Sequence, residues 1–145
     1  MDARKWTAAL ISRTEQAEGV WHVLIEIDFN SQEAIYVQLR NQIVMLIAQD
    51  RLHDGDSLPS VRNLATKLGV NMHTVNKAYA MLRQEGYLKL DRRSGAVISV
   101  EIMDKKNEMM KINDYMQMIV AQAICKEISK DEMLKIVDEM YDKFF

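Results

Sequence analysis

The sequence predicts a mainly α-helical protein with a small β-hairpin: a winged helix-turn-helix followed by two C-terminal helices. Three observations support this fold class. Two short helical patterns, 60–68 and 71–85, meet at a break that contains Gly69. Two extended segments, 87–90 and 96–100, follow and are joined by the turn sequence DRRSG. Helical periodicity then returns after residue 103.

Residues 1–23 are the hardest to assign. The segment ALISRTEQAEG, ending at Gly19, could form a short helix. The next segment, VWHVLIEIDF, is expected to be extended, because Val23, Ile25 and Ile27 alternate with mostly polar residues.

A longer helix is expected from about Ser31 to Asp50. Ser31 or Asn30 can cap it, and Glu33 in its first turn would favour the helix dipole. Its apolar residues recur at three- and four-residue spacing: Ile35, Leu39, Ile43, Leu46 and Ile47. Three polar residues lie off this stripe: Gln38, Asn41 and Gln42.

The two short helices that follow carry their own start and stop signals. Ser60 is the expected N-cap of the first helix, and Gly69 is expected to end it in a left-handed backbone conformation. Asn71 is the expected N-cap of the second helix, which is expected to end at Gly86. Helical spacing predicts one buried edge on each: Val61, Leu64, Ala65 and Leu68, then Val75, Ala78, Tyr79 and Leu82.

The exposed side of the second helix begins with groups suited to reading DNA: His73, Thr74, Asn76 and Lys77. The major groove admits one α-helix, whose N-terminal turns come nearest the base edges. Charge is distributed accordingly. Residues 60–95 hold seven basic and two acidic groups, a balance of +5, although the whole chain has a net charge of −2.

This part of the chain resembles a known family. The segment SLPSVRNLATKLGVNMHTVNKAYAMLRQEGYLKLDRRSGAVISV is similar to the DNA-binding domain of GntR-type bacterial repressors, through its LPS-x-R, LGV, TV, AY and EGYL motifs. The resemblance covers about residues 33–100. It implies an autonomous winged helix, dimeric operator binding, and a C-terminal region that assembles the dimer and often senses a ligand.

The resemblance also implies which residues meet DNA. Arg62 would contact a base edge or phosphate, Ser60 would hold a phosphate, and the wing tip would approach the minor groove or backbone. The implied set is Ser60, Arg62, Met72, His73, Thr74, Asn76, Lys77, Arg92, Arg93 and Gly95. Met72 and His73 replace the proline and asparagine or arginine frequent in the family, and SGAVI replaces the common GTF, so the operator sequence does not transfer.

The last 43 residues predict a helix pair with exposed apolar faces. Ser129 and Glu132 form a capping-box pattern between its two halves. The pair resembles the dimerisation tail of the YtrA-like branch, whose members commonly regulate transporter operons. The expected interface is Ile112, Met116, Ile119, Val120, Ala123, Met133, Val137, Met140 and Tyr141. The many methionines there suit a core and a dimer interface, with a small-molecule pocket as the alternative.

The sequence thus predicts an N-terminal extension of uncertain role (1–23), a DNA-binding domain (24–102) and a dimerisation region (103–145). We expect a cytoplasmic homodimeric repressor that binds an inverted-repeat DNA operator, without a cofactor and without a membrane partner. The alternative is a winged-helix module that binds proteins instead of specific DNA. Scattered histidines argue against a metal site, and no phosphate loop or nucleophile elbow suggests an enzyme. Cys125, the single cysteine, is expected to be buried.

Overall fold

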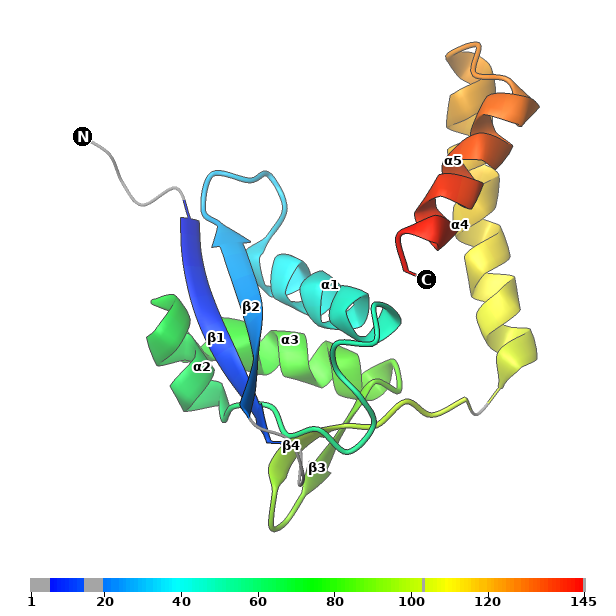
Figure 1. Cartoon of the computed structure of the whole chain (residues 1–145). Coiled ribbons are helices and arrows are strands. Elements are labelled where there is room, and N and C mark those ends of the chain that lie inside the picture. The colour runs from blue at the N-terminus through cyan, green and yellow to red at the C-terminus, as the bar shows by residue number, and fades with distance from the viewer. Residues whose placement is uncertain (1–5, 15–19, 103, 145) are drawn as a thin grey trace. The chain divides into compact units, whose positions relative to one another are not determined.

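A computed structural model describes residues 6–14, 20–102 and 104–144 (Figure 1). The elements follow in the order β1 (Trp6–Thr14), β2 (Val20–Asp28), α1 (Ile35–Ala48), α2 (Val61–Leu68), α3 (Met72–Gln84), β3 (Leu88–Asp91), β4 (Gly95–Ile98), α4 (Lys105–Cys125) and α5 (Lys130–Asp142). The predicted fold class is therefore confirmed. The chain divides into two units, Met1–Glu101 and Ile102–Phe145. In the described part of the chain, none of the helices has the length and apolarity needed to cross a membrane.

The core of the first unit lies beneath α3, which packs against both α1 and α2. The predicted buried edge of α3 is confirmed: Val75, Ala78, Tyr79 and Leu82 are all at most 4% exposed. The stop and start signals are confirmed as well. Gly69 has a φ of 65°, which only glycine adopts at little cost, and the Asn71 side chain accepts a hydrogen bond from the His73 amide at 2.8 Å.

The wing is an antiparallel pair in which Leu88 faces Ile98 and Asp91 faces Gly95. The loop that precedes α2 adds to the free edge of β4. The Leu58 amide donates to the Ala96 carbonyl, and the Ile98 amide to the Asp56 carbonyl, both at 2.8 Å. This ladder ties the wing to the start of the helix-turn-helix, so the two cannot move independently.

The expected helix ending at Gly19 is wrong for the part that the structure describes. Residues 9–14 lie in β1, which pairs antiparallel with β2 from Trp6 opposite Asp28 to Thr14 opposite Val20. A ladder with a neighbouring strand overrides the weak helix propensity of a short Ala- and Leu-containing segment. The extended assignment of β2 is confirmed, and its residues Val23, Ile25 and Ile27 are buried in the core.

The predicted start of α1 is also wrong, by about four residues. The helix begins at Ile35 after the N-cap residue Ala34. The Ser31 hydroxyl instead accepts the Glu33 amide at 3.0 Å and shapes a turn before the helix. Short polar side chains readily form such local bonds in competition with helix caps.

Two glutamines of α1 cover the outer edge of β2. The Gln38 amide nitrogen donates to the carbonyls of Asp28 and Glu33, both at 2.9 Å, and its oxygen accepts the Asp28 amide at 2.9 Å. Gln42 pairs in the same way with the backbone of Glu26. Gln38 was expected on the polar side of the helix but is 8% exposed, because it satisfies backbone groups that a third strand would otherwise bond.

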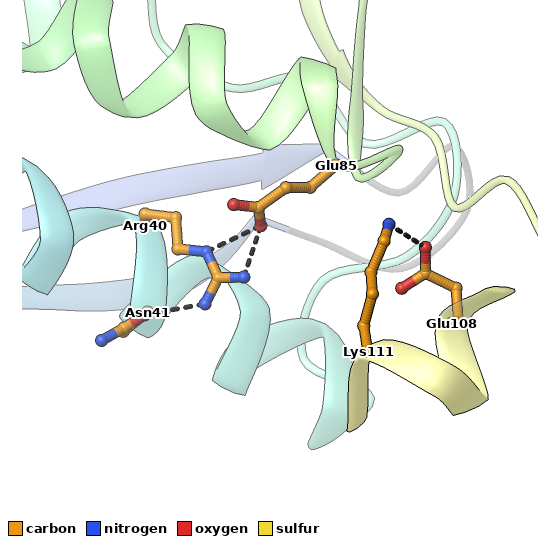
Figure 2. A network of polar contacts seen from close by, with 5 residues as sticks. All are labelled: Arg40, Asn41, Glu85, Glu108 and Lys111. Carbon is orange, nitrogen blue, oxygen red and sulfur yellow. Dashed lines mark hydrogen bonds and ion pairs between the residues drawn. The ribbon is translucent and has the colours of Figure 1, made fainter. Parts of the chain in front are cut away.

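An ion pair braces α1 against the end of α3 (Figure 2). Arg40 Nε donates to Glu85 Oε2 at 2.8 Å, and a second guanidinium nitrogen contacts the same oxygen. Arg40 Nη1 also donates to Asn41 Oδ1 at 2.8 Å. Both ends of α3 are therefore held, one by the Asn71 cap and the other through Glu85.

The second unit is a helix pair with little interior of its own. The predicted capping box is present: Ser129 accepts the Glu132 amide at 3.2 Å, and the Glu132 carboxylate accepts the Ser129 amide at 2.8 Å. Among its described residues only Ala123 is buried. Cys125 is exposed, contrary to expectation, because two helices alone enclose few side chains. Figure 2 also shows the ion pair of Lys111 with Glu108 within α4, at 2.7 Å.

Candidate nucleic-acid interface

The N-terminal turns of α3 project away from the core. Met72, His73, Asn76 and Lys77 are exposed, whereas Thr74 is half-buried. Because the side chains at 75, 78, 79 and 82 fill the core, these polar groups lie on the opposite face of the same helix. The structure thus brings together, on one short surface, the side chains that the sequence predicted for base contact.

The start of α2 is anchored to the buried face of α3. The Tyr79 hydroxyl donates to the Pro59 carbonyl at 2.8 Å, and the Ser60 hydroxyl accepts the Asn63 amide at 3.2 Å. Burial raises the pKa of Tyr79 well above its usual range. Ser60 and Arg62 remain exposed at this anchored end. The guanidinium therefore starts from a fixed backbone beside α3.

The wing tip is shaped by one carboxylate. Asp91 Oδ1 accepts the Ser94 amide at 2.8 Å and the Arg93 amide at 2.7 Å. These backbone hydrogen bonds, that of Ser94 first, lower the pKa of Asp91 below its ordinary value. Gly95 closes the turn with a φ of +73°. Arg92 and Arg93 are exposed at this tip, held by a turn that needs no partner to form.

A hollow of about 120 Å³ separates the outer face of α3 from the wing strand β3. Asn76 and Arg83 border it from α3, and Leu90 borders it from β3. Leu90 is 62% exposed and was not among the residues predicted to meet DNA. Strand alternation could not have indicated its exposure, because Leu90 shares a face of β3 with the buried Leu88.

The Lys77 side chain does not border this hollow but points toward α1. Its ammonium nitrogen is 3.9 Å from the centroid of the Tyr36 ring on α1. Sequence reasoning gave Lys77 no partner, because a contact between residues 36 and 77 has no local signature. Of the residues predicted to meet DNA, Lys77 is thus the one held by a cation–π contact.

The predicted dimer residues fall into two groups. Met116, Val120, Ala123, Met133 and Val137 line an apolar hollow of about 300 Å³ between α4 and α5, with Lys130 at its edge. Ile112, Ile119, Met140 and Tyr141 are exposed by 47% or more. The first group thus lines a groove between the two helices, while the second faces solvent in the single chain. Among the described residues, no cluster of three or more His, Cys, Asp or Glu side chains could hold a metal ion.

Comparison with known proteins gives a consistent result. The family model described as bacterial regulatory proteins, gntR family, matches residues 35–98, which run from α1 to β4. The Bacillus subtilis protein named uncharacterized HTH-type transcriptional regulator YhcF is 30% identical over 109 residues, covering 74% of this chain and 89% of that protein. The HTH-type transcriptional repressor YtrA of B. subtilis is 30% identical over 119 residues, covering 81% and 92%.

A solved structure is similar as well. YtrA from Sulfolobus acidocaldarius, a GntR-family transcription factor, shares 41% sequence identity with a TM-score of 0.54. The match covers 66% of this chain and 97% of that one.

Proposed function

This chain belongs to the gntR family of bacterial regulatory proteins and is a YtrA-like member, and from that premise we propose that it is a cytoplasmic repressor that binds an inverted-repeat operator as a homodimer. It is a DNA-binding transcriptional regulator, and its relatives are named as regulators, not enzymes. The B. subtilis relative YtrA is named a repressor, which supports repression over activation.

The proposal assigns separate tasks to the exposed groups. Met72, His73, Thr74 and Asn76 would enter the major groove, and Arg62 would reach a base edge or the adjoining phosphate. Ser60 and the wing tip would contact the sugar–phosphate backbone. One observation carries this assignment: the capped first turns of α3 are exposed, on a domain whose core holds the opposite face of the helix and whose wing tip is cationic.

The homodimer is supported by the apolar surface of the second unit. Ile112, Ile119 and Tyr141 are 55%, 47% and 65% exposed, although the two helices bury almost nothing between them. A unit of this size needs an additional partner surface to be stable, and a second copy supplies it by symmetry. Two-fold symmetry would place half-sites about one helical turn of DNA apart. Control of a transporter operon and response to a small-molecule effector stay predictions that rest on the family resemblance.

Substitution of Arg62 by alanine tests the assignment. We expect the operator, selected from a random DNA pool by the purified protein, to bind Arg62→Ala more weakly by about 1–3 kcal/mol, with relaxed sequence preference. Arg51→Ala is the matched control, because Arg51 is an exposed arginine outside the proposed contact set. Equal affinity and selectivity for Arg62→Ala and wild type would remove Arg62 from the interface, and failure of the wild-type protein to select any DNA would end the proposal.

A further inference from the structure

The contact of Lys77 with Tyr36 restrains an exposed cation of α3. Tyr36 is half-buried and packs against the hydrophobic core, whereas Lys77 is exposed. A lysine side chain on a surface normally samples many rotamers, which it must give up on binding. Because the ring is anchored and the ammonium lies 3.9 Å from its centroid, part of that freedom is already lost in the free protein.

The restraint points Lys77 to a particular side of α3. Asn76 and Arg83 border the hollow toward the wing strand β3, whereas Tyr36 belongs to α1. The wing strand β3 and the Lys77 ammonium therefore lie on two different sides of the exposed face of α3. A helix in the major groove lies between two sugar–phosphate backbones, so groups on its flanks meet phosphates while groups on its crest meet bases.

We propose that Tyr36 is a positioning residue, which holds Lys77 on the α1 side of α3 so that its ammonium contacts a backbone phosphate and not a base. This inference rests on the proposed function and refines it. An ammonium carries three N–H donors, so one face can rest on the ring while another N–H points outward. Lys77 then adds affinity for any duplex and adds nothing to the choice of sequence. Tyr36 acts only through Lys77, and its hydroxyl is not required.

The test compares wild type with Lys77→Met, Tyr36→Leu, Tyr36→Phe and the double variant of Lys77→Met with Tyr36→Leu. Affinity is measured for the selected operator and for a random duplex between about 50 and 200 mM salt. Lys77→Met should weaken both complexes by the same factor and lower the salt slope by about 0.9. The affinity gap to wild type should then narrow about threefold across that salt range.

The tyrosine variants separate positioning from packing. Tyr36→Leu should weaken both complexes by about two- to fivefold, the equivalent of one exposed cation–π contact, while Tyr36→Phe binds like wild type. In the Lys77→Met background, Tyr36→Leu should have no further effect. The ε-methylene protons of Lys77 should also show an upfield NMR shift from the ring in the wild-type protein. This measurement needs no variant, so it still tests the contact if Tyr36→Leu does not fold.

Several results would overturn the inference. Tighter binding by Tyr36→Leu would mean that the ring competes with DNA for the ammonium. A change of base preference in Lys77→Met, or an unchanged salt slope, would mean that Lys77 does not contact phosphate. These results would leave the proposed function intact if Arg62→Ala still loses selectivity. A wild-type protein that binds no DNA at low salt would instead reject both.

Discussion

Replacing Tyr79 by phenylalanine removes a single oxygen atom from the joint between α2 and α3. The Tyr79 side chain is 4% exposed, and its hydroxyl donates to the Pro59 carbonyl at 2.8 Å. Pro59 directly precedes Ser60, the N-cap of α2. The variant keeps the ring and its packing, so it tests the hydrogen bond and not the core.

The expected loss follows from the environment of the two atoms. A net intramolecular hydrogen bond contributes about 1 kcal/mol, and the half-buried Pro59 carbonyl can regain some contact with water. We therefore expect Tyr79→Phe to lower the free energy of unfolding by about 1 kcal/mol. For a domain of about 100 residues, that corresponds to a fall in Tm of about 4–8 °C. Operator affinity should also fall, because Arg62 extends from the loosened end of α2.

The stability of the protein at alkaline pH tests the role of Tyr79 in a second way. Burial raises the pKa of Tyr79 in the folded protein well above its ordinary value of about 10. A group with a raised folded pKa contributes stability that is fully present below its unfolded pKa, here about 10, and is lost as pH rises toward the folded value. The wild type should lose stability above about pH 10, and the phenylalanine variant should lack that component, so the difference between them should shrink.

Urea unfolding and thermal melting at neutral pH and above about pH 10 measure both effects. Tyr87→Phe is the matched control, since Tyr87 is a half-buried tyrosine at the edge of the same core. An unchanged urea midpoint for Tyr79→Phe would show that the bond contributes nothing. A loss above about 3 kcal/mol would show that the substitution disturbs packing, and would equally refute the single-bond account.

Two further substitutions test the wing and the dimer. Asp91→Ala should weaken DNA binding with little change in melting temperature, because the amides of Arg93 and Ser94 lose their acceptor, whereas Asp91→Asn keeps an acceptor oxygen. Since those bonds lower the pKa of Asp91, order in the wild-type wing should persist above about pH 4 and be lost as pH falls below it, as NMR of the Ser94 amide would show. Ile119→Glu places a charge on an exposed apolar face and should shift the protein from dimer to monomer in sedimentation velocity, with loss of operator binding. A variant that remains fully dimeric would exclude this face from the interface.

Features that depend on neighbours within a turn or two were predictable from the sequence. Ser60, Asn71 and Ser129 cap helices because their side chains reach amides two or three residues ahead. Gly69 ends α2 because few other residues tolerate its backbone conformation. The buried edge of α3 follows from spacing alone, and so does the identity of its exposed face. The fold class derives from such local signals, whereas most of the residues proposed to meet DNA come from the family resemblance.

Features that depend on distant partners were not predictable. β1 is a strand because β2 pairs with it, and nothing within residues 9–14 distinguishes that outcome from a short helix. Gln38 is buried on α1 because its side-chain amide bonds the backbone of Asp28, ten residues away. A pair of glutamines four residues apart on this helix was the only trace of this arrangement in the sequence. The contact between Tyr36 and Lys77 left no trace at all.

The DNA interface should respond differently to mutations of exposed side chains and to mutations of the residues that position them. The exposed residues of α2, α3 and the wing are specified locally, but their mutual placement depends on long-range ties such as those of Tyr79 with Pro59 and Arg40 with Glu85. A change in an exposed side chain alters one contact, and therefore alters preference among sequences. A change in a tie displaces a whole contacting element, and therefore weakens binding to every duplex. The residues that choose the operator and the residues that make binding possible are thus different sets, separable by comparing specific with random DNA.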